Sequence, residues 1–226
     1  MEIKPIAHIY TPFEDKFGIP RQSGLAATEG KIIFTDEYRN PDAVRGLEGY
    51  SHIWLLWQFS HNLREEWSPT VRPPRLGGNK RVGVFATRSP FRPNNIGLSS
   101  VELTKISYDH HKAPVLYVKG ADIVNGTPLY DIKPYISFTD SHPDARCGFA
   151  QEKYGFIPVA EIPGELMDKI PKKSRQPLYE ILQNDPRPAY QEDGDRIYKM
   201  TYEGFTISFV VMENTLTVTD ITPKKD

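Results

Sequence analysis

The chain has little net charge, a single cysteine and no long apolar run. Its 226 residues carry a formal charge of −1 at pH 7, which argues against a protein that coats nucleic acid non-specifically but leaves room for a local basic patch. The one cysteine, Cys147, excludes a disulfide within the chain, and we expect a buried or partly buried thiol. No apolar stretch approaches the ~18 residues of a membrane span, and the first ten residues lack the apolar core of a signal peptide. These absences predict a soluble, cytoplasmic protein.

Several common cofactor motifs are absent as well. No GxGxxG follows a strand-like segment, which argues against a doubly wound dinucleotide site, and no GxxxxGK[ST] is present, which argues against a P-loop. The six histidines lack the spacing of metal ligands, so we expect no metal site.

The first two-thirds of the sequence have the pattern of β-strands. We predict strands over residues 3–10, 24–35, 50–60, 80–87, 101–108, 114–122 and 128–135. Residues 50–60 are almost all apolar or aromatic, which predicts a strand buried on both faces. The one helix expected here covers 40–47, with Asn40 as its cap and Pro41 at its first position. Six or seven strands with irregular links predict an antiparallel β-barrel domain, closed or nearly closed, over residues 1–145.

A different pattern begins near residue 150. Residues 162–184 have helical periodicity, which Pro171 and Pro177 are expected to interrupt. Three alternating strands follow at 195–202, 205–212 and 215–221, with two-residue turns between them. The predicted fold class is therefore mostly β, with the barrel followed by a small α+β domain, residues 150–226, that contains a three-stranded meander.

Positive charge is concentrated between Trp67 and Val101. This stretch has no Asp or Glu, and its basic residues are Arg72, Arg75, Lys80, Arg81, Arg88 and Arg92. Prolines and glycines surround them, and prolines fix the backbone, so each guanidinium is held in place rather than left mobile. Such a loop suits the binding of a carboxylate or a phosphate. The alternative is a solvated loop whose charges pair with acidic residues elsewhere.

Residues 83–99, GVFATRSPFRPNNIGLS, resemble the signature of the S-adenosylmethionine-dependent tRNA adenine-37 N6-methyltransferases. Further similar segments are FGIPRQSG, DAVRGLEGYSHIWLL, VRPPRLGG, NGTPLYDIKPY and DPRPAY, so the resemblance spans most of residues 5–135 and the hexapeptide 185–190. It implies a β-barrel, S-adenosylmethionine (SAM) as the cofactor, tRNA as the partner and a homodimer. The implied reaction is methylation of N6 of N6-threonylcarbamoyladenosine at position 37 of threonine tRNA. The triplet SHN at 60–62 departs from the pattern.

The resemblance also implies which residues bind the cofactor. They are Pro20, Arg21, Gln22, Ser60, His61, Arg88, Leu98, Asn125, Gly126, Thr127 and Pro128. We expect Arg88 to bind the methionine carboxylate, or to fix the loop that does, and Leu98 to pack on the adenine. The alternatives are a salt bridge of Arg88 within its loop and a core position for Leu98. For contacts with RNA the candidates are Arg72, Arg75, Lys80, Arg81 and Arg92.

The hexapeptide DPRPAY supplies the candidates for catalysis. The N6 proton must leave during methyl transfer, and Asp185 is a candidate base, Arg187 a clamp on a carboxylate or phosphate, and Tyr190 a stacking or hydrogen-bonding partner. The alternative is a helix stop at Asp185 followed by a core tyrosine. The sequence does not assign the base.

Two other functions stay open at this point. The chain could be a non-catalytic RNA-binding barrel, or a phosphoester hydrolase, although a hydrolase would need a metal site or a paired nucleophile that the sequence lacks. A further hypothesis is an active site that joins the barrel of one chain to the second domain of another.

Overall fold

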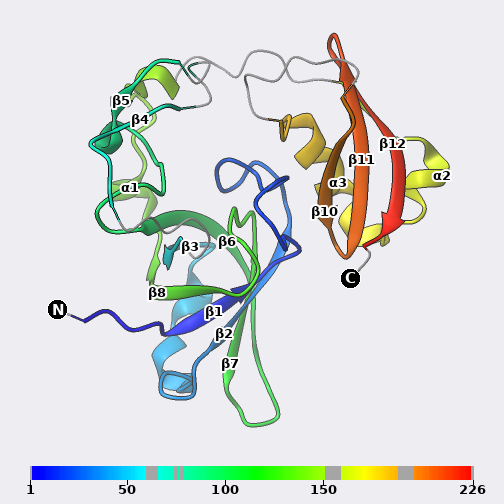
Figure 1. The fold of residues 1–226 in the computed structure, drawn as a ribbon. Helices are drawn as coiled ribbons and strands as arrows, with labels where there is room; N and C mark the ends of the chain where they lie inside the picture. Colours follow the sequence, from blue (N-terminus) through cyan, green and yellow to red (C-terminus); the bar gives the residue numbers. More distant parts are fainter. Residues whose placement is uncertain are drawn as a thin grey trace.

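Residues 7–134 form a closed barrel of six strands, in the order β1-β2-β7-β6-β3-β8 (Figure 1). The computed structural model describes residues 2–59, 66–73, 76, 79–150, 159–187 and 196–224. The barrel strands are β1 (Ala7–Tyr10), β2 (Glu29–Phe34), β3 (His52–Gln58), β6 (Ile96–Tyr108), β7 (Pro114–Lys119) and β8 (Thr127–Pro134). All neighbours pair antiparallel, so the predicted antiparallel barrel is confirmed.

Strand β3 illustrates how the sequence fills this barrel. Ile53, Leu55 and Trp57 are buried inside it, whereas Trp54 on the other face is partly exposed and donates its indole N–H to Asp140 at 2.8 Å. An antiparallel strand with one face on a core has this alternation. The prediction that this run is buried on both faces is therefore wrong, because aromatic residues also occupy its outer face.

The described residues between 66 and 86 form an arm outside the barrel, and this arm carries the start of the signature. In it β4 (Thr70–Val71) pairs with β5 (Val82–Gly83), and a 3-10 turn follows at Val84–Ala86. The predicted strand over residues 80–87 is wrong, because only two of its residues pair.

Two short turns replace the helix predicted over residues 40–47. They are 3-10 turns at Pro41–Val44 and Leu47–Gly49. Asn40 caps the first as expected, with its side-chain oxygen accepting from the Asp42 N–H at 2.9 Å. Gly46 separates the turns at φ 87°, and such a left-handed residue ends a helix.

The end of the first domain is turn-rich. It contains α1 (Ser137–Asp140) and a 3-10 turn at Gly148–Ala150. Cys147 lies beside that turn and is exposed, so the expectation of a buried thiol is wrong.

The second domain is a four-stranded sheet in the order β10-β11-β12-β9, packed against two helices (Figure 1). The strands are β9 (Val159–Glu161), β10 (Tyr198–Tyr202), β11 (Phe205–Met212) and β12 (Thr215–Pro223). The meander β10-β11-β12 is confirmed. Strand β9 was not predicted, since three residues are too few for alternation to be visible; it pairs in parallel with β12.

The helices of this domain are α2 (Gly164–Met167) and α3 (Lys172–Gln183). Pro171 immediately precedes α3, as expected for a residue that separates two helices. Pro177 lies inside α3 and is buried without ending it, so its predicted interruption is wrong. Leu178, Ile181 and Leu182 are buried in the core that α3 shares with the sheet.

The loop between β1 and β2, residues 11–28, joins the two domains. Phe13 is fully buried in the core of the second domain, and the Phe17 ring stacks on Phe209 with centroids 6.3 Å apart and planes 4° apart. In Figure 1 this blue loop reaches from the barrel toward β10. The boundaries 1–145 and 150–226 stay a prediction, because residues 151–158 lie outside the described residues and this loop shares the second core.

Polar contacts accompany this packing. The Ala27 N–H donates to the Glu180 carboxylate at 2.8 Å, and the Asn184 side-chain amide donates to the Leu25 carbonyl at 3.1 Å. The loop therefore holds the C-terminal end of α3 against the barrel. None of the described helices is long and apolar enough to cross a membrane.

We expect Phe13→Ala to destabilise the second domain, because the ring lies wholly within its core. Removing a buried phenylalanine ring costs about 3–5 kcal/mol of unfolding free energy. Urea unfolding of the variant measures this, and Phe138→Ala, at a ring that is 88% exposed, is the matched control. A loss below about 1 kcal/mol for Phe13→Ala would mean that the loop is not part of this core.

Candidate active site

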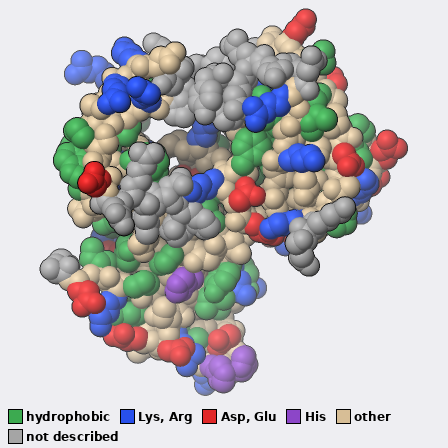
Figure 2. Space-filling model, viewed as in Figure 1, with side chains coloured by type: hydrophobic (Ala, Val, Ile, Leu, Met, Phe, Trp, Pro, Cys, Tyr) green, Lys and Arg blue, Asp and Glu red, His purple; other side chains and the backbone are tan. Residues whose placement is uncertain are grey.

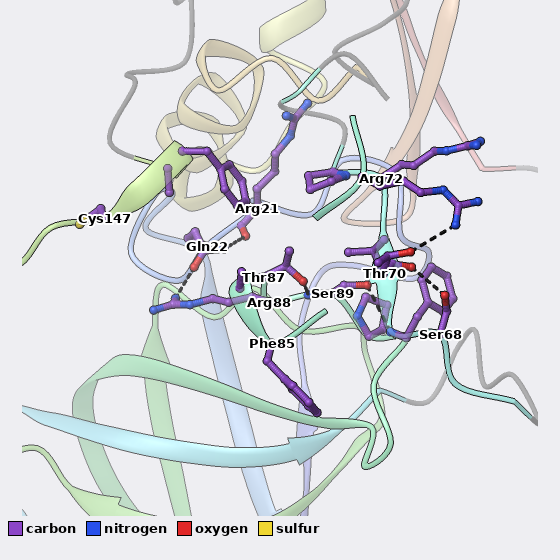
Figure 3. A pocket seen from close by; sticks show the side chains of 18 residues that line it. Arg21, Gln22, Ser68, Thr70, Arg72, Phe85, Thr87, Arg88, Ser89 and Cys147 are labelled. Carbon is purple, nitrogen blue, oxygen red and sulfur yellow. Dashed lines mark hydrogen bonds between the residues drawn. The ribbon is translucent and has the colours of Figure 1, made fainter. Parts of the chain in front are cut away.

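A cavity of about 1180 Å³ lies beside the barrel mouth (Figure 3). Its walls come from the PRQ segment (residues 20–22), the arm, the signature loop (residues 84–95) and residues 147–150. No acidic side chain is among the described residues that line it. Figure 2 shows a hollow between the arm and the second domain with Lys and Arg side chains around it. The cavity therefore suits an anionic ligand.

Internal hydrogen bonds hold the signature loop in one shape. The Arg92 guanidinium donates to the carbonyl oxygens of Thr87 at 2.9 Å and Ser89 at 3.3 Å. The Asn95 amide donates to the Pro90 carbonyl at 2.6 Å. Arg92 thus stabilises the loop from within, and its predicted contact with RNA stays a prediction.

Arg88, in contrast, points out of the loop toward the PRQ segment (Figure 3). Its guanidinium is exposed and donates to the side-chain oxygen of Gln22. Within the described part of the chain it forms no ion pair, so the alternative of a salt bridge inside its loop is not found there.

The PRQ segment continues this contact to the second domain. The Gln22 amide donates to the Arg21 carbonyl at 2.5 Å. The Arg21 guanidinium in turn donates to the carbonyl oxygen of Asp185, at 3.2 Å, and to that of Arg187. Residues of the signature and of the hexapeptide, far apart in sequence, are thereby joined within one chain.

Asp185 and Arg187 form a two-pronged ion pair. The Arg187 Nε lies 2.9 Å from Asp185 Oδ1 and its Nη2 lies 2.9 Å from Oδ2. Both side chains are mostly buried, and the hydrogen bonds that the guanidinium donates to the Asp185 carboxylate raise the pKa of Arg187. Asp185 also has φ 42° and directly follows the C-terminal end of α3. It is therefore a helix stop and a member of a fixed charged pair at once.

Among the remaining predicted cofactor residues that the structure describes, Leu98 lies near the start of β6, NGTP (residues 125–128) leads into β8, and Pro20 lies in the loop between β1 and β2. Leu98, on β6, is 55% exposed, so the alternative of a core position is wrong. Pro20 is buried, and Thr127 is buried with its hydroxyl donating to the Val124 carbonyl at 2.7 Å. Asn125 accepts the Thr11 N–H at 3.1 Å on its side-chain oxygen.

Two adjacent loops bring these segments together. The Gly24 N–H donates to the Gly120 carbonyl at 2.9 Å, so the loop that carries PRQ lies against residues 120–126. In the NGTP segment Gly126, at φ 76°, and the half-buried Pro128 complete the turn into β8. The loop that carries PRQ and the loop that leads into NGTP are therefore in contact through Gly24 and Gly120.

The arm carries exposed cations and aromatic rings, of which Arg72, Arg81 and Phe85 line the same cavity. Arg72, Lys80 and Arg81 are exposed, and Arg81 donates to the Thr70 hydroxyl at 3.2 Å. The rings of Trp67 and Phe85, 52% and 72% exposed, stack with centroids 6.4 Å apart. Exposed rings among cations can stack on unpaired bases beside a phosphate backbone.

Four of the predicted site residues lie outside the described residues: Ser60, His61, Arg75 and Tyr190. Their roles stay predictions. One group that the sequence reasoning missed is Asp122, a carboxylate behind the cofactor segments; its position at the end of an apolar strand was the available signal. Over the described residues no group of three or more His, Cys, Asp or Glu side chains is arranged to hold a metal ion.

Comparisons with known proteins decide the family. Residues 8–141 match the family model of the tRNA-methyltransferase O N-terminal domain, and residues 159–224 match that of the TrmO C-terminal domain. The chain belongs to the tRNA-methyltransferase O family. The resemblance inferred from the signature is thereby confirmed.

Two relatives match the chain over nearly its whole length, and a third matches a shorter part of it. It is 39% identical to the tRNA (adenine(37)-N6)-methyltransferase of Escherichia coli (strain K12), over 99% of this chain and 98% of that protein. A crystal structure of TrmO from Pseudomonas aeruginosa superposes with a TM-score of 0.78 at 29% identity, covering 98% of each chain. A probable S-adenosyl-L-methionine-binding protein of Methanothermobacter thermautotrophicus is 38% identical and covers 62% of this chain and 94% of its own length.

We expect Arg92→Ala to loosen the signature loop. Loss of hydrogen bonds to a charged donor costs about 1.5–3 kcal/mol, so the amides of residues 87–89 and of Phe91 should exchange with solvent faster. Hydrogen exchange read by mass spectrometry measures this, and Arg72→Ala, at an exposed arm residue, is the control. Unchanged exchange together with a loss of tRNA affinity would instead make Arg92 a phosphate contact.

Proposed function

We propose that this protein transfers a methyl group from SAM to N6 of adenosine 37 in tRNA. The observation that carries the proposal is the cavity between the signature loop and the PRQ segment, whose described lining has no acidic side chain, together with the hydrogen bonds by which Arg21 joins that segment to the hexapeptide. Family membership supports the same activity.

The residues at the barrel mouth fit SAM. Arg88 would bind the methionine carboxylate through a charge-assisted pair, and the exposed Leu98 would cover the adenine. Backbone groups of PRQ and NGTP would read the adenine edge and the ribose. When bound, SAM supplies a methyl group made electrophilic by its sulfonium.

The arm would hold the anticodon loop. Arg72, Lys80 and Arg81 would contact phosphates, while Trp67 and Phe85 would stack on unpaired bases near position 37. Because the net charge of the chain is −1, attraction of tRNA phosphates would be limited to the basic surface of the arm.

We further propose N6-threonylcarbamoyladenosine in threonine tRNA as the substrate. Its N6 is urea-like and a poor nucleophile, so the site must position it and accept its proton. The Asp185 carboxylate, held in a fixed orientation by Arg187, would accept that proton at Oδ1 or Oδ2. Arg187 would also face the carboxylate of the threonyl group, a task for which a planar guanidinium is suited.

The protein is proposed to act in the cytoplasm as a homodimer. Each active site would lie within one chain, because Arg21 already joins the barrel to the hexapeptide there. A non-catalytic RNA-binding barrel is the second candidate, and the exposed aromatic pair of the arm is the observation that favours it.

We expect Asp185→Asn to lower turnover by at least ~10²-fold while SAM and tRNA affinities stay within a few-fold, since an amide cannot accept the proton. Methyl transfer to tRNA with and without the threonylcarbamoyl group is the measurement. Asp168→Asn is the matched control, because it removes an exposed Asp-Arg pair with Arg175 in the same domain. Arg187→Lys should abolish the preference for the modified tRNA.

Normal turnover by Asp185→Asn would place the base elsewhere and leave the segment as a helix stop. Wild-type protein that binds tRNA but neither binds SAM nor methylates would establish the RNA-binding alternative.

A further inference from the structure

Asp122 is a partly buried carboxylate whose orientation is fixed by a network of hydrogen bonds. Its Oδ1 accepts the Ser99 hydroxyl at 2.6 Å, and that hydroxyl accepts the indole N–H of Trp57 at 3.0 Å. Gly97 makes this arrangement possible, since a Cβ there would lie 2.3 Å from the Trp57 ring. Two barrel strands, β3 and β6, and the loop after β7 therefore cooperate to orient one oxygen of this group.

Among the described residues, no cation pairs directly with this carboxylate. Within the described ranges, no Lys, Arg or His side chain forms an ion pair with Asp122 within 4 Å. Burial raises the pKa of Asp122, and this is opposed only in part by the Ser99 hydroxyl, the charge of Arg88 and the backbone of Ser23. Burying a carboxylate without a paired cation costs free energy, which a cationic ligand would recover.

The partners of Asp122 are residues next in sequence to two of the proposed cofactor segments. Ser99 follows Leu98 in β6, and Ser23 follows Gln22 of the PRQ segment. Arg88 is the guanidinium whose charge reaches Asp122. One cation and one anion thus share the same small region of the barrel mouth, and the methionyl part of SAM carries both signs of charge.

We propose that Asp122 binds the positive charge of the methionyl part of SAM, at its ammonium or its sulfonium, while Arg88 binds the carboxylate. The assignment rests on the proposed cofactor. It makes Asp122 a cofactor-binding residue that distinguishes a charged methionyl group from a neutral ligand of the same adenosine shape.

Calorimetric titration of Asp122→Asn with three ligands tests this. They are SAM, S-adenosylhomocysteine, which keeps the ammonium but lacks the sulfonium, and 5′-methylthioadenosine, which has neither charge. SAM should bind about 10–100-fold more weakly than to wild type, and 5′-methylthioadenosine within about 3-fold. An equal loss for S-adenosylhomocysteine would place Asp122 at the ammonium; an unchanged value would place it at the sulfonium.

Two further variants keep the test decisive. Asp131→Asn, at a carboxylate that lines a different cavity, should leave all three affinities unchanged. Ser99→Ala should weaken SAM more than 5′-methylthioadenosine, and it decides the matter if Asp122→Asn fails to fold.

Other outcomes would overturn the assignment. An equal loss for all three ligands would mean that Asp122 only shapes the site, and unchanged SAM affinity would mean that it makes no contact. Wild-type protein that binds none of the ligands would refute the proposed cofactor itself, so the two failures are distinguishable.

Discussion

The candidate site depends on the hydrogen bonds that Arg21 donates to the carbonyl oxygens of Asp185 and Arg187. These carbonyls follow the C-terminal end of α3, where the helix dipole favours a cation. The carbonyl of the same arginine accepts a hydrogen bond from the Gln22 side-chain amide, and the Gln22 side-chain oxygen accepts one from Arg88 of the signature loop. One continuous chain of contacts therefore places the hexapeptide beside the barrel mouth.

Apolar packing between the β1–β2 loop and the second domain stabilises the position of these hydrogen bonds. Burying a phenylalanine side chain such as Phe13 contributes roughly 1.5–3 kcal/mol, more than the about 1 kcal/mol net of an ordinary hydrogen bond. The packing of residues 11–28 into the second core thus supplies the stability, and the hydrogen bonds set the register. The resulting cavity is lined by arginines from the PRQ segment, the arm and the signature loop. A chain that is neutral overall can in this way present one cationic face to an anionic substrate.

Alternation of side chains predicted the barrel and the meander, and the signature predicted the family and the loops of the site. The wrong predictions were those in which local sequence preferences did not decide the structure. Pro177 lies within α3 without ending it. Residues 80–87 belong to the arm, because only two of them pair in a strand and a 3-10 turn follows. No local sequence pattern predicts contacts between residues that are far apart in the sequence. The Arg21 contacts join positions 164 and 166 residues apart, and Asp122 matters only because Ser99, Ser23 and Arg88 converge on it.

A complementation experiment tests the central claim, that one chain supplies both halves of its active site. Arg88→Ala chains and Asp185→Asn chains with different tags are co-expressed, and mixed dimers are isolated through both tags. Since every single chain then lacks one half, mixed dimers should methylate tRNA no faster than either variant alone. Recovery of about half of the wild-type activity, as expected when one of two sites in a dimer is intact, would contradict the account and place each site between two chains.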